Sequence, residues 1–464
     1  MTLARTLHSQ LVSGLLFPLQ ERLKRHTTTT LLGQLEHSQW LGLGAIRALQ
    51  GERLHAFMTH LATSVPFYRG WLDEHGLTPA DFRDPGALAR LPVTDKPFMR
   101  AHFEALRSEH AHDLIGARTS GSSGEPLHFL LSRPRISFDI AAKWRATRWW
   151  DVDIGDPELV LWGATQENSA QDRVREWRDR LFATRLIPTG ELSDARLDQI
   201  LGIMRQTRPK QLFGYPSALA RLAFRAIERG LPMNDLGIRV AFCTSEVLRP
   251  EWRQAIASAF GCGVANEYGA RDAGFIAREC PQGGLHITAE ELIVEVVDST
   301  GEPLPPGEEG DILVTNLAGP EFPFLRYRTG DRGALSPLQC PCGRGLPLLQ
   351  QLSGRANDGL RSTRGGWVHG SAINHLMRDL PGLRAYQVVQ HEPDRVSIAI
   401  VTDTPPDPAH TDALAHRLRT LLGDEVRCEV QRTSHIPPAA NGKFRHIICT
   451  LPPPGMPAAP NPRS

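Results

Sequence analysis

The chain has 464 residues, with 52 lysines and arginines against 51 aspartates and glutamates, and a net charge of +1. This length predicts two to three domains at about 100–200 residues each. The balanced charge argues against nucleic acid or an anionic membrane as partner, and no apolar run approaches the ~20 residues of a membrane-spanning helix.

Residues 1–75 are predicted to be helical and to form part of a large domain. Trp40 and several leucines recur at helix-compatible spacing, and Pro66 ends the pattern because the residue before a proline avoids helical geometry. Pro18 and Gln20 interrupt the first apolar run, so we expect no signal peptide. The apolar helices could also serve as the interface of a homodimer.

Strand-like and helical runs alternate from residue 136 to about 330. The predicted strands are 159–162, 212–215 and 240–243, and the predicted helices are 192–206, 217–229 and 250–260. Such alternation predicts an α/β architecture with a mixed or parallel sheet. Two later runs, 291–298 and 311–315, flank a loop rich in glycine and proline and predict an antiparallel pair.

A domain boundary is expected near Gly354. Beyond it, the strand and helix patterns predict a small α+β domain over residues 355–450, including a helix from Ser371, a strand at 395–401 and a helix at 412–422. The proline-rich tail 451–464 is expected to be disordered.

The most informative stretch is Thr119–Gly124, which reads Thr-Ser-Gly-Ser-Ser-Gly. Glycines let backbone N–H groups turn toward an anion, and the hydroxyls add donors, so the segment predicts a phosphate-binding loop. A short apolar strand at 127–131 follows it. No Gly-Lys-Ser/Thr ends the segment, so it is not a Walker A loop, and a flexible Ser/Gly linker is the alternative.

Four further motifs follow in a set order. They are Glu267–Gly274 (Glu-Tyr-Gly-Ala-Arg-Asp-Ala-Gly), Tyr327–Asp331 (Tyr-Arg-Thr-Gly-Asp), Gly354–Asp358 and Asn441–Arg445. Each alone is weak, since Arg-Thr-Gly-Asp is more often an ordinary turn and Gly-Lys is usually a solvated loop. Asp331 is expected to end a strand. In this order the motifs resemble those of the adenylate-forming superfamily, which contains acyl-CoA synthetases, luciferases and peptide-synthetase adenylation domains, over residues 90–447.

Within that superfamily the chain is most similar to the phenylacetate–CoA ligase branch. It resembles the subgroup known as capsular-polysaccharide-associated or coenzyme F390 synthetase-like. The resemblance rests on Ser38–Trp40 with Val65–Arg69, on Tyr215–Ser217 before a helix, and on the Cys-x-Cys-Gly-Arg run Cys340–Arg344.

The resemblance implies a fold and a reaction. The fold is a large adenylation domain of mixed β-sheets flanked by helices over residues 76–354, with a small mobile α+β lid at 355–450. In the reaction, a carboxylic acid attacks the α-phosphate of ATP to give an acyl-adenylate and pyrophosphate, and a nucleophile, usually the thiol of coenzyme A, then displaces AMP. Mg²⁺ is the implied cofactor. Positioning and charge neutralisation supply such catalysis.

The resemblance also implies roles for single residues. The phosphate loop, with Ser120, Gly121, Ser122 and Ser123, holds the β- and γ-phosphates. Tyr268 stacks on the adenine, and Asp331 accepts both ribose hydroxyls. Asp272 stands where the family usually has glutamate and ligates Mg²⁺. The implied ATP-binding set is completed by Ser245, Glu246, Val247, Glu267, Gly269 and Arg355.

Two implied catalytic residues belong to the small domain. Arg355 pairs with the ribose or phosphates, and Lys443 neutralises the α-phosphate and the carboxylate during adenylation. The lid of this family rotates between the half-reactions about a hinge, which aligns with Asn357 and Asp358; the family has aspartate at the position of Asn357.

The implied acyl pocket is formed by Trp162, Gly163, Tyr215, Pro216, Gly269, Ala270 and Arg271. An aryl or arylacetic acid is expected at the level of the family only. Arg271 replaces a small or hydroxyl residue, and it either pairs with an anionic substrate or acceptor or is an ordinary surface arginine.

Three cysteines and a histidine have the spacing of a zinc site. Cys280 and His286 are separated by five residues, and Cys340 and Cys342 follow some fifty residues later. Thiolates and imidazole suit a structural Zn²⁺ with four ligands. Ordinary reduced cysteines are the alternative, and His286 could instead line the active site. The sparse set of seven cysteines favours a reducing cytoplasm.

Three other functions compete with an acyl-CoA ligase. The first is an adenylating enzyme whose acceptor is an amine, a sugar, a carrier protein or a cofactor. The second is a degenerate nucleotide-binding protein, disfavoured by the presence of Asp331, Arg355 and Lys443. The third is a zinc-knuckle interaction protein, for which the absence of a basic cluster disfavours nucleic acid as target.

Overall fold

The computed structural model describes residues 3–119, 127–162, 178–189, 192–355, 359–364, 367–369, 373, 376–377, 380–437 and 444–451. The chain divides into two compact units, Met1–Leu352 and Ser353–Ser464. No helix in these described ranges is long and apolar enough to cross a membrane.

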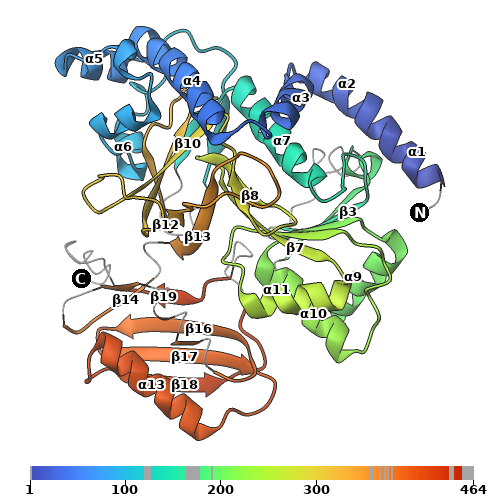
Figure 1. Cartoon of the computed structure of the whole chain (residues 1–464). Helices are drawn as coiled ribbons and strands as arrows, with labels where there is room; N and C mark the ends of the chain where they lie inside the picture. Colours follow the sequence, from blue (N-terminus) through green and yellow to red (C-terminus); the bar gives the residue numbers. More distant parts are fainter. Residues whose placement is uncertain are drawn as a thin grey trace, which may run out of the picture. The chain divides into compact units, whose positions relative to one another are not determined.

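The first unit is built on one eleven-stranded sheet, with the strand order β10-β11-β12-β13-β9-β8-β7-β6-β5-β3-β4 (Figure 1). Its strands are β3 (Glu158–Leu161), β4 (Thr184–Ile187), β5 (Gln211–Gly214), β6 (Val240–Thr244), β7 (Gly263–Ala270), β8 (Gly274–Glu279), β9 (Leu285–Ile287), β10 (Leu292–Val297), β11 (Gly310–Asn316), β12 (Tyr327–Leu335) and β13 (Leu348–Arg355). The strands from β4 to β7 run parallel, whereas β8, β9 and β13 continue antiparallel. The mixed α/β sheet confirms the predicted fold class, and the antiparallel pairing of β10 with β11 was also predicted.

The helices of this unit are α1 (Leu3–Leu11), α2 (Phe17–Leu23), α3 (Thr28–Ser38), α4 (Leu43–Ser64), α5 (Pro66–Glu74), α6 (Lys96–Ala101), α7 (Arg133–Arg148), α9 (Asp194–Thr207), α10 (Pro216–Glu228) and α11 (Pro250–Phe260). A π-helical turn, η1 (Val12–Leu16), joins α1 to α2, and two 3₁₀ turns follow α5 at η2 (Pro79–Asp81) and η3 (Pro85–Arg90). Helices α10 and α11 cover one face of the parallel strands, and α7 lies on the other face with α3 outside it (Figure 1). A separate hairpin pairs β1 (Ile115–Arg118) with β2 (His128–Leu131).

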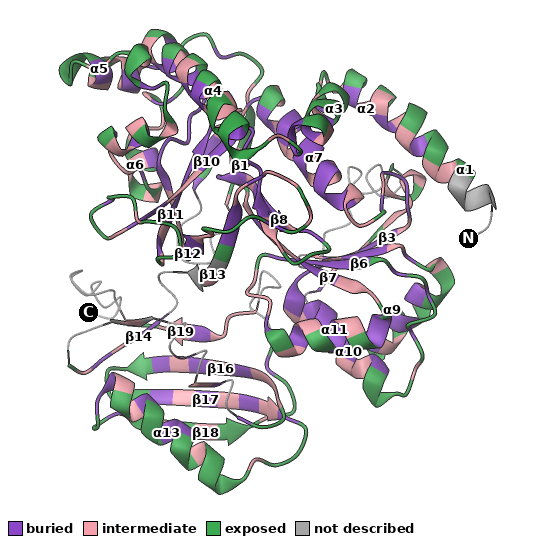
Figure 2. Cartoon of the chain, viewed as in Figure 1, coloured by how far each residue is buried: buried purple, intermediate pink, exposed green. Residues whose placement is uncertain are grey.

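Local sequence explains several of these boundaries. Pro66, Pro216 and Pro250 each begin a helix, where the missing N–H costs nothing. Val65 has the extended dihedrals φ −112° and ψ 107° that a residue before proline prefers, and it ends α4 as predicted. Strand β6 is buried along its whole length, as expected for an apolar strand inside a parallel sheet (Figure 2).

The second unit has a four-stranded sheet of order β18-β17-β16-β19 with α13 (Pro408–Leu422) packed on it. The strands are β16 (Leu383–Glu392), β17 (Arg395–Thr402), β18 (Arg427–Arg432), β19 (Ile447–Cys449) and a hairpin of β14 (Gly359–Arg361) with β15 (Trp367–His369). Strand β17 and helix α13 confirm the predicted strand at 395–401 and helix at 412–422. The tail beyond Leu451 and most of residues 370–379, where the helix from Ser371 is predicted, lie outside the described residues.

Candidate active site

The carboxyl ends of four parallel strands meet at one edge of the sheet. Leu161, Gly214, Cys243 and Asn266 are successive partners across β3, β5, β6 and β7. Ligands of open α/β sheets bind at such edges. The predicted residues within three positions after these partners therefore lie at this edge; they are Trp162, Tyr215, Ser245, Glu246 and Tyr268.

Two aromatic residues of the predicted acyl pocket lie face to face. The rings of Trp162 and Tyr215 stack with centroids 4.5 Å apart and an interplanar angle of 26°. Gly214, just before Tyr215, permits the close approach of β5 to β3, since a Cβ there would lie 2.5 Å from the carbonyl oxygen of Leu161. The pair forms an apolar wall at the sheet edge, and Pro216 follows as the first residue of α10. Gly163 lies outside the described residues.

The segment after β6 is held in a specific backbone conformation. Ser245 has φ 68°, a left-handed value that is uncommon for a residue other than glycine, and its strain is typical of functional loops. A carboxylate oxygen of Glu246 accepts a hydrogen bond from the backbone N–H of Ser217 at 3.1 Å. Glu246 thus helps to cap α10, while Val247 follows in the same loop.

Tyr268 and Asp331 form the first of two hydroxyl–carboxylate pairs. The Tyr268 hydroxyl donates to Asp331 Oδ2 at 3.0 Å and lies 3.2 Å from Thr329 Oγ1. Burial and the charge of Asp331 raise the pKa of Tyr268 well above its usual value, so its hydroxyl stays a donor. The prediction that Asp331 ends a strand is wrong: β12 begins at Tyr327 and continues to Leu335, because its pairing with β11 persists to Gly333.

Asp272 and Tyr327 form the second pair. The Tyr327 hydroxyl donates to Asp272 Oδ2 at 2.7 Å, and the N–H of Ala273 donates to Oδ1 at 3.1 Å. The buried Arg135 contacts the backbone carbonyl of Asp272. Sequence reasoning gave no role to Tyr327 or Arg135. Tyr327 opens the quoted Tyr-Arg-Thr-Gly-Asp motif, whereas no local signal marks Arg135.

Two neighbours of Tyr268 serve local structure. The Glu267 carboxylate contacts the guanidinium of Arg278, which is fully buried and lies over the Phe242 ring at 3.9 Å. A Cβ at Gly269 would lie 3.0 Å from the carbonyl oxygen of Gly274, so this tight turn needs a small residue. The turn brings Ala270 into register with Gly274 and leaves the next residue, Arg271, exposed.

The hairpin of β1 and β2 carries the predicted phosphate loop. Thr119 donates its N–H to the carbonyl of Leu127 at 3.0 Å, and its hydroxyl accepts the N–H of Leu127 at 2.9 Å. Arg271 donates from Nη1 to the carbonyl oxygen of Arg118 at 3.2 Å, so it lies against this hairpin.

Several predicted positions lie outside the described residues. They are Ser120, Gly121, Ser122, Ser123, Gly124, Asn357, Asp358 and Lys443. Arg355 is the last residue of β13.

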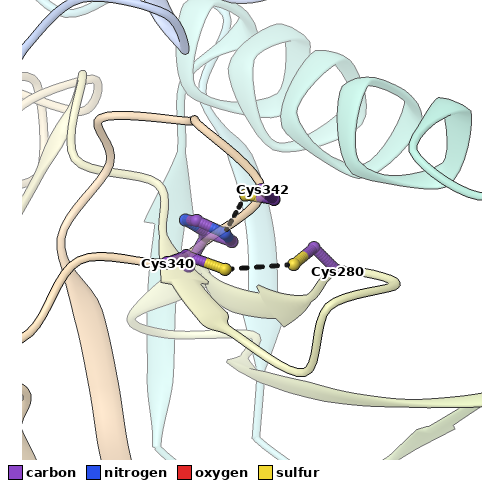
Figure 3. A group of neighbouring side chains, drawn as sticks. Cys280, Cys340 and Cys342 are labelled. Atoms are coloured by element: carbon purple, nitrogen blue, oxygen red, sulfur yellow. Dashed lines mark hydrogen bonds between the residues drawn. The ribbon is translucent and has the colours of Figure 1, made fainter.

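The four predicted zinc ligands lie together. The sulfur atoms of Cys280, Cys340 and Cys342 and a ring nitrogen of His286 are all within 4.8 Å of one another. The Cys280 and Cys340 sulfurs are 3.6 Å apart, and the Cys342 sulfur is 3.2 Å from His286 Nε2. Figure 3 shows that Cys340 and Cys342 come from one loop and face Cys280 on another. The donor set fits a tetrahedral metal ion.

The surroundings of this group suit metal ligands. Burial lowers the pKa of His286 to about 4, so its imidazole is neutral at neutral pH. Burial raises the pKa of Cys280 to about 12. Burial also acts upward on Cys342, but hydrogen bonds from the Arg344 backbone and side chain leave its pKa below the usual value. A cation among these sulfurs would stabilise their thiolate forms.

Comparisons with known proteins show what the chain is similar to. Residues 360–450 match the family described as the CapK C-terminal domain. The chain is 26% identical over 440 residues to phenylacetate–coenzyme A ligase of Thermus thermophilus, covering 87% of this chain and 96% of that one. It is 22% identical over 404 residues to protein CapK of Staphylococcus aureus, covering 86% and 88%.

A solved structure gives the fold. A 2-hydroxyisobutyryl-CoA ligase, in the postadenylation state with an acyl-AMP ligand, superposes with a TM-score of 0.66 at 21% identity and covers 86% of this chain and 88% of its own. The chain is thus similar to phenylacetate–CoA ligases and to CapK along most of its length, and its fold is that of the solved acyl-CoA ligase.

Proposed function

We propose that the protein is an AMP-forming ligase that activates a carboxylic acid with ATP and transfers the acyl group to coenzyme A. The observation that carries the proposal is the pair of clusters Tyr268–Asp331 and Asp272–Tyr327 at the carboxyl edge of the sheet. They present an aromatic ring and two held carboxylates beside the hairpin of the predicted phosphate loop. Similarity to phenylacetate–CoA ligases along most of the chain supports the same reaction.

The first half-reaction joins the acid to AMP. A carboxylate oxygen forms a bond to the α-phosphorus of ATP, and the bond from this phosphorus to the bridging oxygen breaks, so pyrophosphate leaves with the electron pair. Asp331 orients the ribose, and the Tyr268 ring lies against the adenine. Asp272, held by Tyr327, would bind Mg²⁺ directly or through water, and the ion neutralises phosphate charge. Lys443 adds a positive charge at the α-phosphate and Arg355 at the ribose or phosphates.

The second half-reaction transfers the acyl group. The sulfur of coenzyme A, after loss of its proton, attacks the acyl carbon, and AMP leaves with the former carboxylate oxygen. We propose that the second unit moves about Asn357 and Asp358 between the two steps. The wall of Trp162 and Tyr215 favours an acid with an aromatic or other flat apolar body.

Pyrophosphate release tests the proposed function. Purified protein is given ATP and Mg²⁺ with aryl, arylacetic, fatty and amino acids in turn, each with and without coenzyme A. The proposal predicts release that requires one class of acid and becomes faster with coenzyme A. Release that requires an acid but ignores coenzyme A would move the acceptor to an amine, a sugar or a carrier protein. No release with any acid, from protein that binds ATP, would contradict the proposal.

The Lys443→Ala variant separates the half-reactions. We expect it to lose nearly all adenylate formation, because one positive charge at the reacting phosphate typically contributes a factor of about 10²–10³. Thioester formation from a supplied acyl-adenylate should stay close to that of the wild type. An equal loss of both steps would contradict the movement of the second unit.

We propose that Zn²⁺ binds Cys280, His286, Cys340 and Cys342. With four protein ligands the ion has no open position, so its role is structural: it joins the loop before β9 to the loop after β12. Metal analysis of freshly purified protein should give about one zinc per chain. A ratio near zero would contradict this site.

We also propose a cytoplasmic homodimer. None of the seven cysteines, all of which are described, forms a disulfide, which favours a reducing compartment. Val12 and Phe17 are buried in a core cluster, whereas leucines at every fourth position stay at least half exposed. This leucine row consists of Leu7, Leu11, Leu15, Leu19 and Leu23. A two-fold dimer brings the same surface of each copy together, so the leucine rows of two antiparallel copies can pack against each other. Light scattering should give a dimer that Leu15→Glu dissociates, and a monomeric wild type would contradict the interface.

A further inference from the structure

A pocket of about 430 Å³ lies against the β1–β2 hairpin. Phe103, Phe129 and Leu130 supply apolar surface, and Arg118, His128 and Arg271 supply polar groups. None of the described residues that line it is acidic. The basic side chains attract an anion, and the apolar side chains exclude water that would otherwise compete with the anion for them. We call the basic residues Arg118, His128 and Arg271 the rim of the pocket.

The fold brings the three basic residues to one face. Arg118 and His128 are directly opposed in the antiparallel hairpin, so their side chains leave the same side. Arg271 comes from the turn after β7, and its hydrogen bond to the Arg118 carbonyl places it over the hairpin. That bond occupies one N–H group and leaves the rest of the guanidinium fork available. All three side chains are exposed, so a ligand can reach them.

The chain neighbours of these residues indicate which anion fits. Arg118 precedes Thr119, and His128 follows Leu127, which closes the loop on Thr119. Each end of the predicted phosphate loop thus carries a basic residue. Arg271 precedes Asp272, the proposed Mg²⁺ ligand. An anion held by this rim would therefore lie beside both groups that are proposed to hold the polyphosphate and its metal.

We infer that Arg271, Arg118 and His128 bind the β- and γ-phosphates of ATP and hold them as the pyrophosphate leaving group. The inference rests on the proposed function and assigns Arg271 to the leaving group instead of the acyl pocket. The planar guanidinium fork matches two phosphate oxygens at once, which an ammonium group does not do.

Calorimetric titration with magnesium pyrophosphate, magnesium ATP and AMP tests the inference. We expect Arg271→Ala to weaken pyrophosphate and ATP binding about 10-fold or more, since a charge-assisted contact of this kind is lost. AMP binding should not change, because AMP lacks both phosphates. Arg118→Ala should also weaken pyrophosphate, and it keeps the backbone carbonyl that positions Arg271. Arg47→Ala, an exposed arginine paired with Asp84 elsewhere, is the matched control and should behave as the wild type.

The outcomes separate this inference from the proposed function. Unchanged pyrophosphate affinity in Arg271→Ala and Arg118→Ala, in protein whose wild type releases pyrophosphate with an acid, overturns the inference alone. A loss that affects AMP equally, or that falls only on the KM for coenzyme A, also overturns it. Failure of the wild type to release pyrophosphate with any acid counts against the proposed function, whatever the titrations give.

Discussion

Two kinds of polar cluster in the first unit differ in how their members contact one another. The hydroxyl–carboxylate clusters contain strong hydrogen bonds, whereas the thiol–imidazole cluster, formed by three cysteines and His286, does not. Tyr268 with Asp331, and Tyr327 with Asp272, each pair a donor with an acceptor at 2.7–3.0 Å. In the thiol–imidazole cluster, the Cys280 and Cys340 sulfurs are 3.6 Å apart, and the Cys342 sulfur lies 3.2 Å from an imidazole nitrogen of His286. Thiols are weak donors and weak acceptors, so this group gains little from its own contacts.

The difference predicts what each cluster needs. In each hydroxyl–carboxylate cluster the tyrosine hydroxyl already donates a hydrogen bond to the carboxylate, so the carboxylate is oriented before a substrate binds. The four ligand atoms of the thiol–imidazole cluster lie within 4.8 Å of one another, so the cluster becomes favourable when a cation binds to it. One site is therefore expected to act in chemistry and the other in stability.

Breaking the thiol cluster should give the largest effect. Cys340→Ser should lower the free energy of unfolding by more than about 4 kcal/mol, as loss of a structural metal typically does. Denaturant unfolding measures this change, and chelation should destabilise the wild type in the same direction. Cys262→Ser, which removes a thiol outside the cluster, is the control and should cost much less. Equal losses in the two variants would show that the cluster holds no metal.

Removing the charge of Asp331 should give the next largest effect. Asp331→Asn keeps the shape of the side chain but weakens acceptance from two ribose hydroxyls, so we expect kcat/KM for ATP to fall about 100-fold. Steady-state pyrophosphate release measures it. The thermal stability should change little compared with Cys340→Ser. If kcat/KM for ATP stayed at the wild-type value, the proposed binding of the ribose by Asp331 would be wrong.

Removing the hydroxyl of Tyr327 from its pair with Asp272 should give the smallest effect. Tyr327→Phe leaves Asp272 with one fewer donor, so the Mg²⁺ concentration for half-maximal activity should rise about 10-fold. The control is Tyr68→Phe, whose buried hydroxyl has no hydrogen-bond partner within the described part of the chain. If the Mg²⁺ concentration for half-maximal activity were unchanged in Tyr327→Phe, the proposed role of Asp272 as a Mg²⁺ ligand would be contradicted.

The sequence predicts those features that depend on local chemistry. The helix expected at 250–260 is α11 to the residue, because its starting proline and the glycine after it are local signals. The strand expected at 240–243 is β6, since an unbroken apolar run suits a buried strand. The proximity of Cys280, His286, Cys340 and Cys342 was predicted because thiols and imidazole at such spacing are typical of a metal site, whereas their binding of zinc stays a prediction.

The contacts that complete the site depend on tertiary structure. Tyr327 reaches Asp272 across 55 positions of sequence, and Arg271 reaches Arg118 across 153. No local pattern encodes such pairs. The first arises from the order of strands in the large sheet, and the second from the packing of the separate β1–β2 hairpin against the turn after β7. For the same reason, the pairing of β12 with β11 carries the strand past Asp331, where the turn-like residues Thr329 and Gly330 suggested its end.

Oxygen transfer tests the central claim most directly. The acid that supports pyrophosphate release is supplied with ¹⁸O in its carboxylate, and the AMP formed with coenzyme A is analysed by mass spectrometry. An acyl-adenylate intermediate predicts one ¹⁸O atom in each AMP, because the attacking carboxylate oxygen stays on the α-phosphorus. AMP without ¹⁸O, or label found in inorganic phosphate together with ADP, would contradict the account.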